Sequence, residues 1–113
     1  MENIKSIDEI EEDIYYQKET YQGWTNRETW ALNLHLTNTE GIYNDFMSIV
    51  KSENFSDYEK ENNLKDWVED LIYNFFENNQ EMLYFEEIKN LIQDVGSLWR
   101  VNYKEIINSN KED

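Results

Sequence analysis

At 113 residues the chain is long enough for one domain with a single core and too short for two. It carries 25 acidic and 10 basic residues, a formal net charge of −15, and its lack of cysteine excludes disulfides, a thiolate nucleophile and a cysteine-type zinc site. Nucleic-acid phosphates and anionic lipid repel such a surface, so we expect neither a direct nucleic-acid partner nor a membrane partner.

Helices are the expected element throughout, because the chain has no proline and only three glycines. Residues 1–21 form an acidic leader, in which a capping box of Ser6 and Glu9 precedes three isoleucines at helical spacing. The leader lacks the basic and apolar regions of a signal peptide, and no apolar run is long enough to span a bilayer. We therefore expect a cytoplasmic protein.

Residues 26–38 form the segment around which the other elements are expected to pack. A second capping box, Thr25 with Glu28, predicts a helix start. The apolar residues that follow alternate with polar or small ones, as in a half-buried strand, so a strand over residues 30–37 stays open as the alternative. As a helix, the segment has two apolar stripes and would be buried on both sides. The alternating residues are Trp30, Leu32, Leu34 and Leu36.

Two further helices follow the central segment. Residues 42–50 carry apolar residues at helical spacing, and residues 51–55 indicate a connection. A third capping box, Ser56 with Glu59, opens the longest amphipathic segment, residues 57–78, whose apolar residues recur at steps of three and four.

The last third of the chain predicts two more helices. Apolar residues between 83 and 99 indicate a helix, and Gly96 predicts a bend or break within it. A fourth capping box, Asn102 with Glu105, begins a short final helix. We expect residues 109–113 to fray.

These elements predict an all-α fold: a compact single-domain bundle of about five or six helices around a central buried helix at about residues 26–38. The core domain is expected to span residues 22–108, between the leader and the frayed tail.

Three segments resemble a family of small, acidic, largely uncharacterised proteins of phages and other mobile elements. Residues 23–30, GWTNRETW, are similar to its Gly-Trp-x-Asn-x-Glu-Thr-Trp signature. Residues 38–43, NTEGIY, and residues 101–106, VNYKEI, resemble two weaker family motifs in the same order. The chain departs from the family at Arg27, at His35 and in its leader. The resemblance implies a small helical domain from a mobile element and no catalytic residues.

The sequence offers little support for catalysis. His35 is the only histidine, and no local motif supplies the nucleophile or orienting carboxylate that a general base needs. No calcium-loop spacing, phosphate loop or nucleophile elbow is present. We therefore predict a protein that is not an enzyme and has no catalytic, metal or cofactor-binding residues.

The acidic surface is the unusual feature, because residues 53–87 alone hold eleven acids against two lysines, a net of −9. Rows of carboxylates on helices can compete with phosphates for a basic nucleic-acid groove. With the mobile-element resemblance, this predicts an inhibitor of a host defence nuclease, a CRISPR or restriction effector, in the cytoplasm of a bacterial host. The candidate partner-binding residues are Asp8, Glu11, Glu12, Asp57, Glu61, Asp66, Glu69, Asp70 and Glu77.

The alternative is a small adaptor protein that binds a host protein through an aromatic patch, with the charge serving solubility. Its expected anchors are exposed Tyr15, Tyr16, Tyr21 and Trp24. In both hypotheses, repulsion among the acids favours a monomer or a homodimer joined through apolar faces.

Overall fold

The computed structural model describes residues 20–78 and 82–112. The helices in this part of the chain are α2 (Arg27–Asn38), α3 (Glu40–Val50), α4 (Asp57–Asn78), α5 (Phe85–Val95), the short 3-10 helix η2 (Leu98–Arg100) and α6 (Tyr103–Asn110). The only β-type pairing among the described residues is an isolated bridge between Tyr21 and Trp24. The all-α prediction is confirmed.

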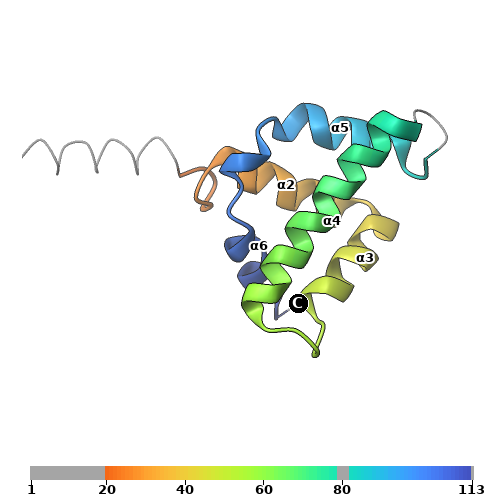
Figure 1. Cartoon of the computed structure of the whole chain (residues 1–113). Coiled ribbons are helices and arrows are strands. Elements are labelled where there is room, and N and C mark those ends of the chain that lie inside the picture. Colours follow the sequence, from red (N-terminus) through yellow and green to blue (C-terminus); the bar gives the residue numbers. More distant parts are fainter. Residues whose placement is uncertain (1–19, 79–81, 113) are drawn as a thin grey trace, which may run out of the picture.

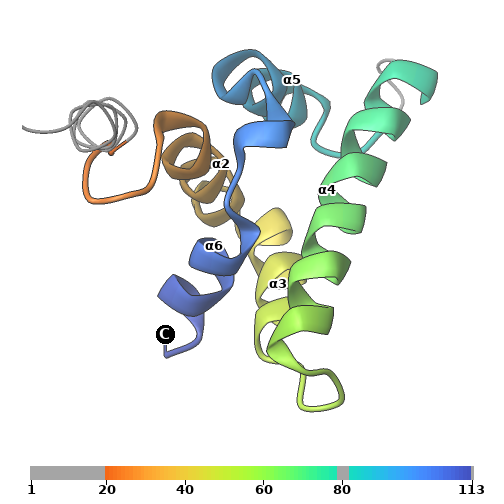
Figure 2. The same ribbon diagram turned by 60° about the vertical axis from the view of Figure 1, so that its left-hand side comes forward.

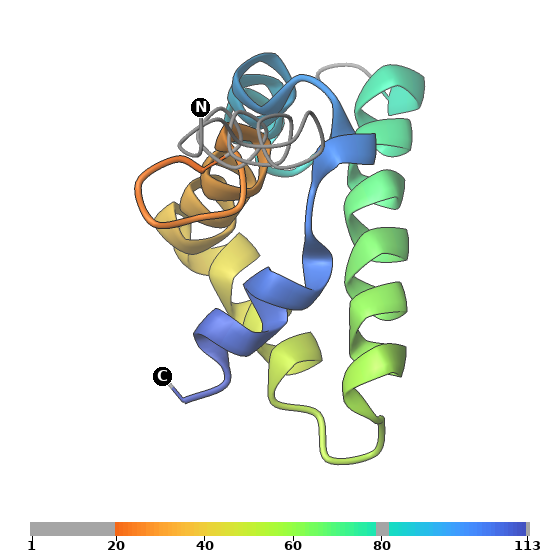
Figure 3. The same cartoon turned by 90° about the vertical axis from the view of Figure 1, so that its left-hand side faces the viewer.

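Helix α2 lies at the centre of the arrangement, because it packs against α3, α5, η2 and α6. Helix α4 runs along one side of the domain and packs against α3, α5 and α6, as Figures 1 and 2 show. In Figure 3 the chain descends from η2 to α6. One long face of α4 is therefore left pointing away from the other helices.

The alternating segment after Trp24 is a helix, and the strand alternative is wrong. Its two apolar stripes are not equally buried, however. Leu32 and Leu36, one turn apart, are fully buried, whereas Trp30 and Leu34 are half-buried at the edge of the core. The ring of Trp30 lies 4.9 Å from that of Tyr21. One side of α2 therefore faces the core, which comprises Ala31, Leu32, Leu36, Ile42, Phe46, Val50, Leu64, Val68, Ile88, Leu91, Val95, Val101, Ile106 and Ile107.

The predicted capping boxes have mixed outcomes. Ser56 and Glu59 form the reciprocal pair at the start of α4: the Ser56 N–H donates to Glu59 Oε1 at 2.9 Å, and the Glu59 N–H donates to Ser56 Oγ at 3.2 Å. The box of Thr25 and Glu28 is wrong, since Asn26 caps α2 instead and accepts from the Thr29 N–H. The box of Ser6 and Glu9 lies outside the described residues.

The break predicted at Gly96 is confirmed. Helix α5 ends at Val95, and Gly96 has φ of +76°, a left-handed conformation that glycine adopts without a steric cost. The chain then turns into η2. Two residues assigned by sequence to the apolar stripe of this helix lie outside it and are exposed, Leu83 at 75% and Trp99 at 82%.

The carboxyl-terminal segment corrects the expectation of fraying from residue 109. Helix α6 continues through Asn110, which is buried and donates to Asn33 Oδ1 and to the Ile106 carbonyl, both at 2.8 Å. Lys111 Nζ lies 2.7 Å from Asp57 Oδ2, and the Lys111 carbonyl accepts from Lys51 Nζ at 2.7 Å. The segment is therefore attached to α2, α4 and the end of α3.

Candidate functional site

Four carboxylates follow one line along the outer side of α4, and we call them the acidic face: Glu59, Asp66, Asp70 and Glu77. All four are exposed. Their positions differ by seven, four and seven residues, so at about 100° per residue they lie within about 40° of one another around the helix. Leu64 and Val68, on the opposite side, are fully buried. The acidic face thus points away from the domain, along the side of α4 that other helices leave open in Figures 2 and 3.

The spacing of the carboxylates along the acidic face can be compared with that of the phosphates along a DNA strand. At 1.5 Å per residue its carboxylates project from positions about 10.5, 6 and 10.5 Å apart along the helix. Phosphates of one duplex DNA strand recur about every 3.4 Å along its axis. The carboxylates therefore match steps of about three, two and three phosphates, at a lower charge density than the strand itself.

The acidic face is unfavourable for the helix that carries it. Asp66 and Asp70 are one turn apart, and such like-charged pairs destabilise a helix by about 0.2–0.5 kcal/mol. Glu77 lies in the last turn of α4, which contains no basic residue. A negative charge there opposes the helix dipole at a cost of about 0.3–1 kcal/mol. Stability of α4 therefore does not explain Asp66, Asp70 and Glu77. Glu59 differs from them, because a negative charge in the first turn favours the helix dipole and its carboxylate accepts from the Ser56 N–H as part of the cap.

The structure separates the acids that the sequence grouped together on α4. Asp66, Asp70 and Glu77 lie on the acidic face, and Glu69 is turned by about 80° from it, toward α6. Proximity of Glu69 contributes to a raised pKa of the Tyr103 hydroxyl.

The other predicted partner-binding residues lie elsewhere. Asp57 is paired with Lys111, and this hydrogen bond lowers the pKa of its carboxyl. Glu61 is half-buried and lines a groove between α4 and residues 99–104. Asp8, Glu11 and Glu12 lie outside the described residues.

Sequence reasoning placed Glu59 in the capping box and on the polar side of the helix but left it out of the candidate partner-binding residues, whereas it belongs to the acidic face. Its carboxylate accepts from the Ser56 backbone N–H, which lowers its pKa and keeps it ionised. The spacing of seven and four residues already contained this signal.

The aromatic anchors expected for an adaptor are not at the predicted places. Tyr21 and Trp24 are half-buried: the Tyr21 ring packs on Trp30, and Trp24 packs against the core, so neither side chain is exposed as expected. Tyr15 and Tyr16 lie outside the described residues. The exposed aromatic side chains come mostly from α4 and its surroundings: Phe55, Tyr58, Tyr73, Phe76 and Trp99.

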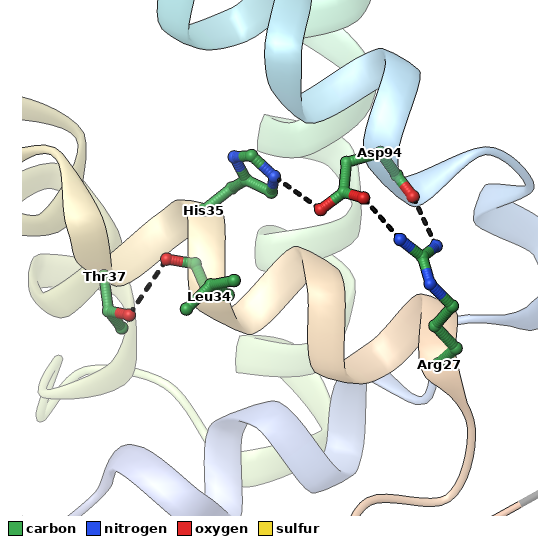
Figure 4. Close-up of polar contacts among 5 residues, drawn as sticks. All are labelled: Arg27, Leu34, His35, Thr37 and Asp94. Atoms are coloured by element: carbon green, nitrogen blue, oxygen red, sulfur yellow. Dashed lines mark hydrogen bonds and ion pairs between the residues drawn. The ribbon is translucent and has the colours of Figure 1, made fainter. Parts of the chain in front are cut away.

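His35 forms part of a polar cluster that joins α2 to α5. Its Nε2 lies 2.9 Å from Asp94 Oδ2, while Arg27 donates to the other oxygen of Asp94 and, at 2.6 Å, to the Asp94 carbonyl (Figure 4). The hydrogen bond from His35 and the pairing with Arg27 lower the pKa of the Asp94 carboxyl. These contacts from His35 and Arg27 to Asp94 hold α2 against α5, and we call the cluster a clamp between the two helices.

Replacing Asp94 by asparagine tests this clamp. The lowered folded pKa means that the carboxylate stabilises the fold above its ordinary pKa of 3.8, and that this contribution disappears as the pH falls through the lower folded value. Because the Arg27 and Asp94 side chains are 45% and 34% exposed and their interaction is screened by solvent, we expect a loss of up to about 1 kcal/mol at pH 7. Urea unfolding of Asp94→Asn at pH 7, and at a pH below the lowered pKa of Asp94, measures this loss in the free energy of unfolding. Asp45→Asn is the exposed control. Equal losses at both pH values would contradict the clamp.

Within residues 20–78 and 82–112, no group of three or more histidine or acidic side chains is arranged to hold a metal ion. None of the helices is both long and apolar enough to cross a membrane, again within residues 20–78 and 82–112.

Comparison with known proteins places the chain in a family. The model of a family of unknown function, DUF7249, matches residues 17–107. No curated protein and no solved structure matches the chain. Since the family model covers most of the sequence, the chain belongs to DUF7249.

Proposed function

We propose that this DUF7249 member is a non-enzymatic inhibitor of a host defence nuclease, a CRISPR or restriction effector, which it binds through the acidic face of α4 in place of nucleic acid. The partner is a host protein with a basic nucleic-acid channel, in the bacterial cytoplasm. One observation carries the proposal: a line of exposed carboxylates on a helix, three of which, Asp66, Asp70 and Glu77, the stability of that helix does not require.

The net charge of the chain and the ordered helix also support this proposal. The chain carries a net charge of −15, so the whole molecule attracts a basic partner at long range. Opposite charges then speed association and make it sensitive to salt. A rigid helix also keeps the carboxylates in position before binding, so little conformational entropy is lost in ordering them.

Capture from host lysate at two salt concentrations tests the proposal. Immobilised chain is expected to retain a DNA- or RNA-binding nuclease at about 50 mM salt and to release most of it at about 500 mM, where the Debye length falls to a few ångströms. Mass spectrometry identifies the retained proteins. If no nucleic-acid-binding protein is enriched at low salt relative to a column carrying a neutral protein, the proposal is wrong.

The adaptor remains a second candidate because three aromatic side chains of α4 are exposed: Tyr58 at 71%, Tyr73 at 63% and Phe76 at 66%. Aromatic residues commonly dominate the energetics of protein interfaces. Retention of the partner at high salt, with loss on replacing Tyr73 and Phe76 by serine, would favour this candidate over mimicry.

A further inference from the structure

A polar groove of about 580 Å³ lies between α4 and the segment from Trp99 to Lys104. Its size falls within the range of small-molecule sites, about 300–1,000 Å³. Helix α4 contributes Glu61, Asn62 and Lys65 to its lining, residues 99–104 form the opposite side, and Thr25 and Asn26 before α2 complete it. The acidic face lies on a different side of α4, so the groove is a separate feature.

The charge of the groove is opposite to that of the chain. Lys65, Arg100 and Lys104 line it with a single acid, Glu61, although acids outnumber bases 25 to 10 overall. Arg100 Nε lies 3.6 Å from Glu28 Oε2. Neither lysine has a hydrogen bond or ion pair among the described residues. Three cationic side chains beside one carboxylate, in so acidic a protein, form a local site for an anion.

Tyr103 also lines the groove, but its hydroxyl is buried and has no hydrogen-bond partner among the described residues. Burial, with the nearby Glu69 carboxylate, raises the pKa of Tyr103 to about 12. Tyr103 therefore forms part of the wall of the groove, and the two lysines are the donors for an anion.

Trp99 supplies a flat apolar surface at the mouth of the groove. The residue is 82% exposed, and the Arg100 guanidinium lies 5.6 Å from the centre of its ring. Stacking of a nucleobase on an aromatic side chain is worth about 1–3 kcal/mol. The groove therefore combines a stacking surface with donors for an anion.

We propose that this groove binds a mononucleotide, with its phosphate between Lys65 and Lys104 and its base on Trp99. Glu61 is then placed to accept hydrogen bonds from the ribose hydroxyls. A free nucleotide fits better than a nucleic-acid strand, because the acidic surroundings repel a long polyanion. This site is independent of the nuclease partner proposed above.

Titration of the purified full chain with the four ribonucleoside monophosphates tests the proposal by calorimetry and tryptophan fluorescence. At least one is expected to bind with 1:1 stoichiometry, a Kd of about 1 mM or tighter, and quenching of fluorescence. Lys65→Gln, Lys104→Gln and Trp99→Leu should each weaken binding by about tenfold or more, whereas Lys89→Gln on α5, a matched loss of charge outside the groove, should not.

Titrations with inorganic phosphate, adenosine and a single-stranded dodecamer show which part of a nucleotide the groove recognises, and whether it prefers a free nucleotide to a strand. Phosphate and nucleoside alone are expected to bind at least about tenfold more weakly than the nucleotide, because each makes only part of the contacts. Absence of saturable nucleotide binding, equal affinity for phosphate alone, or tighter binding of the dodecamer would each overturn the proposal. These titrations contain no host protein, so their outcome is independent of nuclease inhibition.

Discussion

Replacing Asn26 by alanine is expected to lower the free energy of unfolding by about 2–4 kcal/mol. Asn26 is buried, and its Oδ1 accepts from both the Thr29 N–H at 2.9 Å and the Thr29 hydroxyl at 2.7 Å. Its Nδ2 donates to the Arg100 carbonyl at 2.7 Å. Alanine removes the cap of α2, a loss of about 0.5–2 kcal/mol, and leaves buried groups without partners, which costs about 1–3 kcal/mol.

The loss is large because the cap also joins two helix starts. Thr29 Oγ1 accepts from the Asn102 N–H at 2.9 Å, and Asn102 Oδ1 caps α6 by accepting from the Glu105 N–H at 3.0 Å. The Glu105 carboxylate in turn accepts from the Thr25 N–H at 3.0 Å. The starts of α2 and α6 are thus held by one network of hydrogen bonds, and disturbing one start disturbs the other.

Urea unfolding monitored by circular dichroism measures this effect. Ser56→Ala is the matched control, because it removes an exposed cap from α4 and should cost only about 1 kcal/mol. Asn26→Asp keeps the acceptor for the cap but loses the donor to the Arg100 carbonyl. Its free energy of unfolding should therefore lie between those of the wild type and Asn26→Ala. A loss in Asn26→Ala no larger than in Ser56→Ala would contradict the network.

The double variant Asp70→Lys/Glu77→Lys is expected to be more stable than the wild type and to bind the nuclease partner at least about 100-fold more weakly. Lysine at position 70 turns the repulsion with Asp66 into attraction, and lysine at position 77 complements the helix dipole, together worth about 1–2 kcal/mol. In the complex the same lysines face a basic surface, and juxtaposed like charges cost several kcal/mol.

The control for this variant is Asp45→Lys/Glu53→Lys, which changes the net charge equally at exposed positions outside the acidic face. It should weaken binding only slightly, through the reduced long-range attraction. Opposite changes in stability and affinity are the signature of acids kept for function. If both double variants lose affinity equally, net charge and not the acidic face determines binding.

Sequence patterns located the helices well where the deciding contacts are local. The steps of three and four in α4 and the Ser56–Glu59 box were sufficient because both partners lie within one turn. Near Thr25 the sequence predicted a cap by Thr25 with Glu28, whereas in the structure Asn26 caps α2. The contacts that decided between them come from Arg100 and Glu105, more than 70 residues away in the sequence.

Other features could not be predicted for the same reason. The attachment of Lys111 to Asp57 depends on how α6 lies across the start of α4. Gly41 on α3 leaves room for Tyr84, the N-cap residue of α5, because a Cβ atom at Gly41 would lie 1.7 Å from the Tyr84 hydroxyl and would displace that side chain. The acidic face could have been found from its spacing alone, whereas the groove beside Trp99 required the fold.

Competition with nucleic acid tests mimicry most directly. The captured nuclease is loaded with a fluorescently labelled duplex or guide RNA, and its anisotropy is followed as the chain is added, for the wild type and for Asp70→Lys/Glu77→Lys. Mimicry predicts that the wild type displaces the nucleic acid completely, that no ternary complex forms, and that the variant needs at least about 100-fold more protein. A stable ternary complex, or displacement that is unaffected by the two lysines, would contradict it.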